Sequence, residues 1–187
     1  MIKDLHTLPN NLPVPIDDGA CDHLMGSALP SVSLASTRGR SVDLSAYGGT
    51  LVIYFYPMLG RPDSPPLVGW NEIPGARGCT PQTCAFRDHY AELKQLGIEV
   101  YGVSAQSLEN QQEAHARLHL PFELLNDGNL ALTRALRLPT FEYAGAQLIK
   151  RLTVITMNKI IHKVFYPVFP PDKNAHEVIA WLTARQV

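Results

Sequence analysis

The segment LVIYFYP, residues 51–57, limits what this chain can fold into more than any other stretch. It is an unbroken run of β-branched and aromatic side chains, which is typical of a strand buried on both faces. Such a strand lies inside a sheet that is covered above and below. We therefore predict that residues 51–57 form a central strand.

Helical and strand-like patterns alternate along most of the remaining chain. A helix is predicted over residues 81–96, because Phe86, Tyr90 and Leu93 recur at i, i+4 and i+7 spacing and Gly97 follows as a natural stop. The other predicted elements are a short strand or hairpin at 31–44, strands at 98–105 and 122–125, helices at 108–118 and 130–136, a hairpin of 151–156 with 160–165, and a final helix at 172–185. This order predicts an α/β fold whose sheet is covered on both faces.

The chain is expected to contain an arm, a domain and a long loop. Residues 1–25 are polar with scattered prolines and predict an N-terminal arm, while residues 26–187 form the domain. Prolines and glycines recur between residues 58 and 78 too often for a regular helix or strand, which predicts an inserted loop. Trp70 and Ile73 are the expected apolar anchors of this loop.

The composition is that of a globular protein: 187 residues, 45% of them hydrophobic. A net charge of −1 without long basic runs argues against nucleic acid as a partner. The N-terminus lacks an apolar signal region and no segment reaches about 18 apolar residues, so we expect no membrane partner and a cytoplasmic location. Three cysteines form no even disulfide framework and the histidines show no metal-ligand spacing, which favours redox chemistry without a metal.

The segment GCTPQTCAFRD, residues 78–88, carries the most specific chemical signal. A turn containing glycine leads into the predicted helix, with Thr80 as the expected N-cap and Pro81 as the expected first helical residue. Free N–H groups at a helix start and a nearby cation stabilise a thiolate at such a place. The cation would be Arg77, Arg87 or one that the fold brings in.

The three cysteines differ in their surroundings. Cys79 stands at the helix start and is the candidate nucleophile, and Cys84 is close enough in sequence to trap whatever Cys79 becomes. Cys21 lies among carboxylates that raise its pKa and slow its reactions, so we expect no redox role for it. These carboxylates belong to Asp17, Asp18 and Asp22.

The same segment resembles the active-site stretch of the atypical, bacterioferritin-comigratory (Q-type) peroxiredoxins. The resemblance extends over roughly residues 26–187, with further matching segments in family order. These are LVIYFYP at 51–57, VYGVSAQS at 100–107, LPFELLND at 120–127 and RLTVIT at 151–156. It implies the thioredoxin-like fold, a central mixed sheet flanked by helices.

The resemblance also implies an activity and a set of site residues. Cys79 would attack the peroxide and become a sulfenic acid, Cys84 would resolve it, and Arg151, which matches the family arginine, would stabilise the thiolate and the peroxide. The implied enzyme is a thiol-dependent peroxidase for hydrogen peroxide and organic hydroperoxides. It would use thioredoxin or a similar dithiol as reductant, need no cofactor, and act as a monomer or homodimer.

One part of the family motif is missing here. The family pattern PxxxTxxC would place a threonine where this chain has Ala76, and the nearest proline after the predicted strand is Pro57, which implies an insertion of about fifteen residues. Pro74 is closer to the cysteine but out of register. A hydroxyl from Ser64 or Thr80, or else a backbone group, would have to replace the threonine.

Other interpretations of these residues remain open. Cys84 also fits an ordinary core position on a helix face, and Arg151 also fits a solvated charge at a strand end. A thioredoxin-like thiol–disulfide oxidoreductase would need CxxC, whereas the spacing here is CxxxxC. A non-enzymatic, redox-responsive binding module would use the proline-rich loop as its contact surface.

Overall fold

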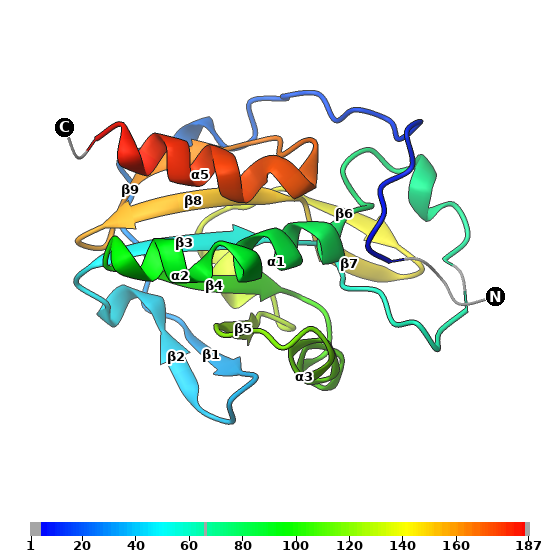
Figure 1. Ribbon diagram of the computed structural model, residues 1–187, viewed down its shortest axis with the longest axis horizontal. Helices are drawn as coiled ribbons and strands as arrows, with labels where there is room; N and C mark the ends of the chain where they lie inside the picture. Colours follow the sequence, from blue (N-terminus) through cyan, green and yellow to red (C-terminus); the bar gives the residue numbers. More distant parts are fainter. Residues whose placement is uncertain (1–4, 66, 186–187) are drawn as a thin grey trace.

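The computed structural model describes residues 5–65 and 67–185. Seven strands form one mixed sheet in the order β2-β1-β5-β4-β3-β8-β9, and β6 and β7 form a separate antiparallel hairpin (Figure 1). The strands are β1 (Ser33–Ser36), β2 (Ser41–Asp43), β3 (Thr50–Phe55), β4 (Ile98–Ser104), β5 (Glu123–Asn126), β6 (Thr140–Tyr143), β7 (Ala146–Ile149), β8 (Leu152–Met157) and β9 (Ile160–Phe165). This arrangement confirms the predicted α/β fold with a central mixed sheet.

Strand β3 occupies the centre of the sheet. It pairs in parallel with β4 and antiparallel with β8, and the side chains of residues 51–55 are fully buried. Val52 and Tyr54 point into one core cluster while Leu51 and Ile53 point into the other. The unbroken apolar run therefore supplies both cores, as a strand covered on both faces requires.

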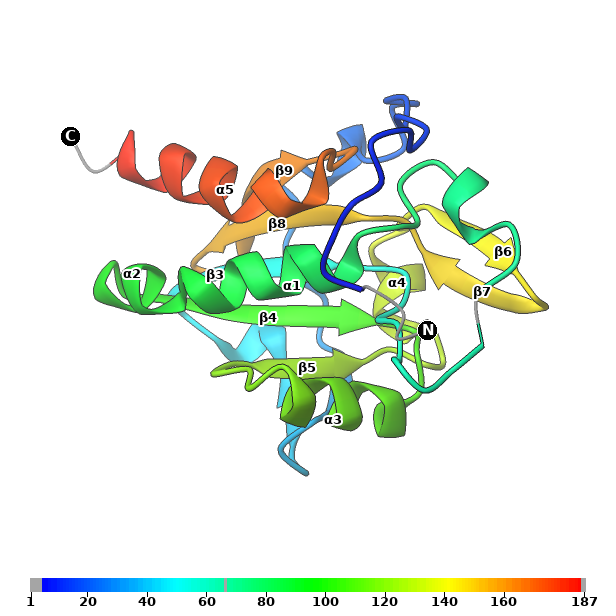
Figure 2. The ribbon, with the colours of Figure 1, turned by 45° about the vertical axis from the view of Figure 1, so that its right-hand side comes forward.

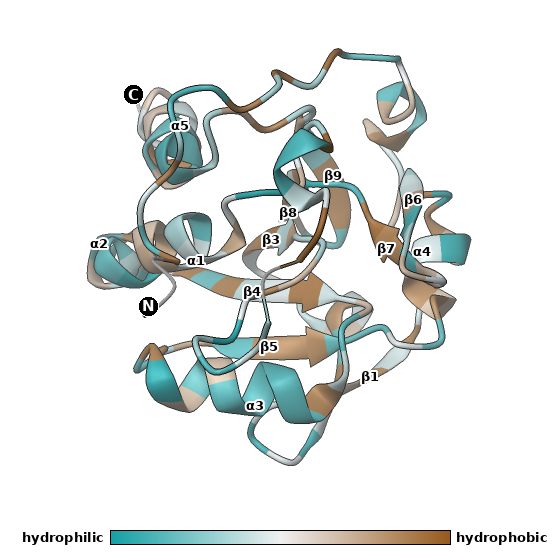
Figure 3. Ribbon diagram, turned by 90° about the vertical axis from the view of Figure 1, so that its right-hand side faces the viewer, coloured by the Kyte–Doolittle hydropathy of each residue, from teal (hydrophilic) through white to brown (hydrophobic). Residues whose placement is uncertain are grey.

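Helices cover one face of the sheet more fully than the other (Figure 2). The helices are α1 (Cys79–Asp88), α2 (Tyr90–Gln95), α3 (Leu108–Arg117), α4 (Ala131–Ala135) and α5 (Asn174–Thr183). The first core cluster takes its side chains from α1, α2, α3 and α5, whereas the second takes them from α4 and from the arm at Cys21 and Leu24. In Figure 3 the solvent side of α3 is mostly hydrophilic while the end of β5 behind it is hydrophobic.

The predicted helix over residues 81–96 is in fact two helices, and it starts earlier. The helical conformation is interrupted at His89, between α1 and α2. Cys79 is the first residue of α1. Gly78 is the N-cap, with a left-handed φ of 107°, so the prediction that Thr80 caps the helix was wrong. Pro81 is tolerated as the third helical residue because N–H groups in the first turn have no partner within the helix.

The hairpin of β6 and β7 was not predicted. Its two-residue turn has positive φ at both Ala144 and Gly145, and alanine is uncommon at such a position, so the usual Asn-Gly signal is absent. The loop at 58–78 packs on this hairpin through Trp70, whose ring lies 4.9 Å from that of Tyr143. Ile73 packs against the same cluster, so the predicted anchoring of the loop is confirmed.

Two further expectations concern membranes and metals. None of the helices in the described ranges is both long enough and apolar enough to cross a membrane. Among the residues that the structure describes, no three side chains of His, Cys, Asp or Glu are grouped in a way that could hold a metal ion.

Candidate active site

Cys79 lies at the start of α1, beneath the long loop. Its side chain is 3% exposed, and its Sγ lies 3.6 Å from the carbonyl oxygen of Ala76. The residue forms part of the wall of a cavity of about 190 Å³. The rest of the wall comes from the arm (Leu5), the loop (Met58, Gly60, Leu67, Trp70, Asn71, Arg77, Gly78) and the helix start (Thr80). The thiol is therefore shielded, with one small cavity beside it.

Arg151 is the residue just before β8, and its side chain reaches the Cys79 thiol. Its guanidinium Nη2 donates to Cys79 Sγ at 3.2 Å, and its side chain is also buried, at 3% exposed. The same guanidinium donates to the carbonyl oxygens of Gly75 (3.2 Å), Ala76 (3.1 Å) and Arg77 (3.3 Å) and to Oε1 of Gln82. Within the described chain, no carboxylate is among its hydrogen-bond partners.

This set of contacts has an electrostatic consequence. A buried charge is costly unless an opposite charge or several hydrogen bonds compensate it. The acceptors around Arg151 are all neutral except for Cys79, which becomes an anion when it loses its proton. Deprotonated Cys79 would therefore be the one anion among these hydrogen-bond acceptors of Arg151.

The cations proposed from sequence proximity do not donate to the sulfur in the described hydrogen bonds, although Arg77 lines the cavity beside Cys79. Arg77 donates to the carbonyl oxygen of Thr7, and Arg87 donates to Asp88 and to the carbonyl oxygen of Leu118. The cation at the sulfur is instead the one that the fold brings in. Because Arg151 is buried, it is not the solvated strand-end charge that the sequence left open.

Cys84 lies in the second turn of α1 and belongs to the first core cluster. Burial raises the pKa of its thiol. Its Sγ lies 3.9 Å from Nδ1 of His6 in the arm. Five residues along a helix turn through about 500° and rise about 7.5 Å, so Cys79 and Cys84 leave α1 on different faces. Both thiols are free, together with Cys21.

Comparison with known proteins gives this arrangement a family. The Redoxin family model matches residues 24–179. A putative chloroplastic peroxiredoxin Q from Oryza sativa subsp. indica is 32% identical over 155 residues, covering 82% of this chain and 64% of the rice protein. Chloroplastic peroxiredoxin Q from Sedum lineare is 32% identical over 158 residues, covering 84% of this chain and 76% of that protein. This chain belongs to the redoxin family, in its peroxiredoxin Q group.

A solved structure agrees in fold with this assignment. Peroxiredoxin Q from Xanthomonas campestris superposes with a TM-score of 0.66 at 25% identity, covering 94% of this chain and 99% of that one. The chain spans somewhat less than two thirds of the length of the rice relative. The match extends over the strands and helices that place Cys79, Cys84 and Arg151.

Ala76, which stands where the family motif has a threonine, meets the Cys79 sulfur through its main chain. The Ala76 carbonyl oxygen accepts hydrogen bonds from both Arg151 Nη2 and Cys79 Sγ. The Ala76 methyl group is buried in the cluster that contains Trp70. Of the two hydroxyls considered from the sequence, Thr80 lines the cavity beside Cys79, whereas Ser64 is not among its described lining residues.

A buried network behind Arg151 was missed in the sequence. Gln82 accepts from Arg151 and donates to Asn174 Oδ1 at 3.0 Å, and Thr153 donates to the same oxygen at 2.7 Å. These residues come from α1, α5 and β8, so no local pattern links them. The one sequence signal is that Gln82 lies inside the cysteine motif.

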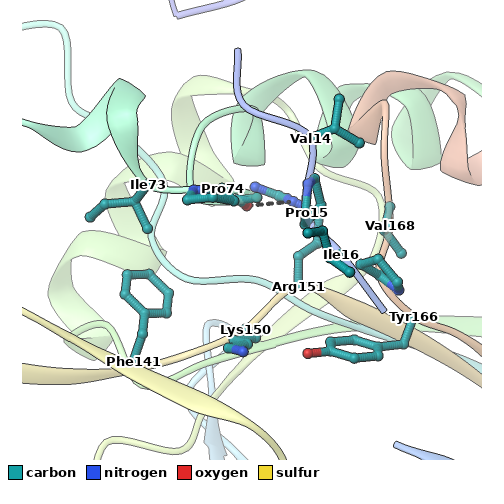
Figure 4. A pocket seen from close by; sticks show the side chains of 12 residues that line it. Val14, Pro15, Ile16, Ile73, Pro74, Phe141, Lys150, Arg151, Tyr166 and Val168 are labelled. Atoms are coloured by element: carbon teal, nitrogen blue, oxygen red, sulfur yellow. Dashed lines mark hydrogen bonds between the residues drawn. The ribbon is translucent and has the colours of Figure 1, made fainter. Parts of the chain in front are cut away.

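A second cavity, of about 320 Å³, is lined by residues 73–75 of the loop and does not include Cys79 in its described lining (Figure 4). Figure 4 shows Arg151 rising from the start of β8 toward Pro74 and Pro15, while Lys150 and Phe141 line the opposite wall. Lys150 is held by Asp18 at 3.0 Å. This cavity is mostly apolar, and Arg151 is the group that it shares with the Cys79 site.

Cys21 lies on the far side of the sheet from Cys79 and Cys84, in the second core cluster. Burial raises the pKa of Cys21 to about 12, and the charges of Asp18, Asp17 and Asp22 add to the effect. This agrees with the effect predicted for those carboxylates. A thiol in that environment stays protonated and reacts slowly.

Proposed function

We propose that this protein is a thiol-dependent peroxidase that uses Cys79 as peroxidatic cysteine, Cys84 as resolving cysteine and Arg151 as the group that stabilises both thiolate and peroxide. The single observation that carries the proposal is the contact between buried Arg151 and the Cys79 sulfur at 3.2 Å. A thiol paired with a buried guanidinium that lacks a carboxylate partner is placed to react as a thiolate.

The first step of the proposed reaction is an attack on the peroxide. The Cys79 thiolate attacks one peroxide oxygen, the O–O bond breaks, and the second oxygen leaves with the electron pair and takes a proton to become water or an alcohol. Cys79 is left as a sulfenic acid. Arg151 faces the developing charge, and a preorganised donor of this kind stabilises the transition state. Because its Nη2 also contacts Ala76 and Arg77, the incoming peroxide oxygen would replace one of these carbonyl acceptors.

The second step forms a disulfide. The sulfur of Cys84 attacks the Cys79 sulfenic acid, and water is released. A dithiol such as thioredoxin then reduces the disulfide and closes the cycle. Hydrogen peroxide and organic hydroperoxides are the proposed substrates, since the cavity beside Cys79 is small and partly lined by Leu5, Met58 and Trp70. A cytoplasmic location and a monomeric or homodimeric state complete the proposal.

The proposed function is best tested in a single turnover, which needs no knowledge of the physiological reductant. The reduced protein, in a Trp181→Phe background that leaves Trp70 in the wall of the Cys79 cavity as the fluorophore, is mixed with hydrogen peroxide or cumene hydroperoxide, and the tryptophan fluorescence is followed with time. We expect a fast change in the wild type and in Cys21→Ser, and none in Cys79→Ser. Peroxide consumption in a thioredoxin-coupled NADPH assay should show the same dependence. A reaction that survives in Cys79→Ser would contradict the proposal.

A further inference from the structure

The first described residues of the arm lie at the start of α1, beside that end of the helix in Figure 1 and in front of it in Figure 2. Leu5 packs so closely on Gly60 that a Cβ added there would come within 2.9 Å of Leu5 Cδ2. Leu8 approaches Gly78 to the same extent, and Arg77 donates to the carbonyl oxygen of Thr7 at 3.3 Å. The arm segment 5–8 thus packs against the loop at Gly60 and against the start of the cysteine motif.

His6 is the residue of this segment that reaches Cys84. Its Nδ1 lies 3.9 Å from the Cys84 Sγ, within reach of a hydrogen bond to sulfur. Cys84 is 8% exposed, and burial keeps its thiol protonated. A protonated thiol is a poor nucleophile, so the resolving step needs a group that removes the proton.

The other charged groups that act on Cys84 are unsuited to this task. Arg87 and Arg117 favour the thiolate by their charge, but a guanidinium does not accept a proton. Asp88 opposes the thiolate and is paired with Arg87 at 2.8 Å. A neutral imidazole, in contrast, can accept a proton through Nδ1 when its other nitrogen carries the hydrogen.

We propose that His6 is the general base of the resolving step, taking the proton of Cys84 as this sulfur attacks the sulfenic acid of Cys79. The S–S bond forms as the S–O bond of the sulfenic acid breaks, so Cys84 is oxidised and the sulfenic acid is reduced. The oxygen leaves as hydroxide, takes the proton from the His6 imidazolium and is released as water. This inference rests on the function proposed above and adds a residue outside the matched family range.

The surroundings of His6 fit a transient positive charge. Asp172 lines the same surface cavity as His6, and within the described chain its Oδ1 is buried without a hydrogen-bond partner. A carboxylate in the same cavity favours an imidazolium by its charge, while its Oδ2 lies 3.9 Å from Nζ of Lys173.

The test separates the two steps of turnover in four proteins: wild type, His6→Ala, His6→Phe and Leu8→Ala. Phenylalanine keeps a ring in the arm but cannot accept a proton, and Leu8→Ala loosens the arm without touching the imidazole. Stopped-flow fluorescence gives the rate of Cys79 oxidation, and dimedone trapping with mass spectrometry gives the rate at which the sulfenic acid disappears.

We expect the oxidation rate to stay within about twofold in all four proteins, and the resolving rate to fall at least about tenfold in both His6 variants but not in Leu8→Ala. Added imidazole should restore part of the resolving rate in His6→Ala. A wild-type resolving rate in His6→Phe, or an equal loss in Leu8→Ala without imidazole rescue, would overturn the role of His6. If wild-type Cys79 does not react with peroxide at all, it is the proposed function that fails.

Discussion

At the scale of single residues, the guanidinium of Arg151 is the group whose geometry matters most. Its fork reaches the Cys79 sulfur, two carbonyl oxygens and Gln82 at once, and an ammonium keeps the charge without the fork. Arg151→Lys should therefore lower the rate of Cys79 oxidation at least about tenfold, equivalent to about 1.4 kcal/mol of barrier. Arg134→Lys, at an exposed position on α4, is the matched control and should keep the wild-type rate. Stopped-flow kinetics measures both, and equal rates in the two variants would reduce Arg151 to a structural role.

How much of the site could be predicted from the sequence follows from where its residues stand in the chain. Cys79 and Cys84 lie in one contiguous motif, and Arg151 was found because a family pattern marks its position. Gln82 and His6 meet their partners only through tertiary packing, across 69 and 78 residues of sequence. Helix periodicity and motif spacing hold no information on such contacts.

At the scale of elements, α1 has to open for the disulfide to form. The Cα atoms of Cys79 and Cys84 in a regular helix are about 8.6 Å apart, whereas a disulfide needs less than about 7 Å. Amides from residues 79–86 should therefore exchange faster with solvent after one equivalent of peroxide, while those of β3 stay protected. Hydrogen exchange with mass spectrometry measures this, and the same digest should contain a Cys79–Cys84 linkage within one monomer. Unchanged exchange in the oxidised protein would mean that α1 does not open.

The start of α1 also depends on a glycine. Gly78 has a left-handed φ of 107°, and a Cβ there would come within 2.3 Å of Pro171, while Gly97, with φ of 74°, has no atom within 4 Å of such a Cβ. Both Gly→Ala variants carry the cost of a left-handed alanine, about 1–2 kcal/mol, and Gly78→Ala adds a collision. We expect Gly78→Ala to lose at least about 1 kcal/mol more stability than Gly97→Ala in urea unfolding. Equal losses would show that Pro171 gives way freely.

The same helix shows why some boundaries escaped prediction. Apolar spacing at Phe86, Tyr90 and Leu93 continues through the break at His89, because both α1 and α2 face the same core cluster. The start at Cys79 follows a left-handed Gly78 that has no room for a side chain beside Pro171, which is distant in sequence. In contrast, β3 was predictable, because a strand buried on both faces needs an apolar side chain at nearly every position.

At the scale of the whole molecule, the far edge of the sheet is held by an ion pair that depends on pH. Burial opposes the ionisation of Glu123, yet hydrogen bonds from Arg40 and Ser36 hold the pKa of Glu123 below its usual range. A carboxylate whose pKa is lowered in the folded state stabilises the folded protein at pH values above its ordinary pKa of about 4.5. This stabilisation is lost as the pH falls through the lowered pKa.

Glu123→Gln should accordingly lower the free energy of unfolding by about 1–3 kcal/mol at neutral pH. The difference from the wild type should shrink once the pH falls below the lowered value, because the wild type then loses the same interaction. Urea unfolding across this range measures the gap, with Glu142→Gln, at an exposed position on β6, as control. A gap that stays constant with pH would show that the charge of Glu123 is not what stabilises this edge.

The arm seated on α1 lies outside residues 24–179, the range that the family model matches, except at its last residues. Cys79, Cys84 and Arg151 lie within the matched range, whereas the base proposed for the second step lies outside it. Changes confined to the arm can therefore alter the lifetime of the sulfenic acid, and with it the tendency to overoxidise. Exchanging the arm between relatives should change how readily the proposed peroxidase is inactivated by excess oxidant.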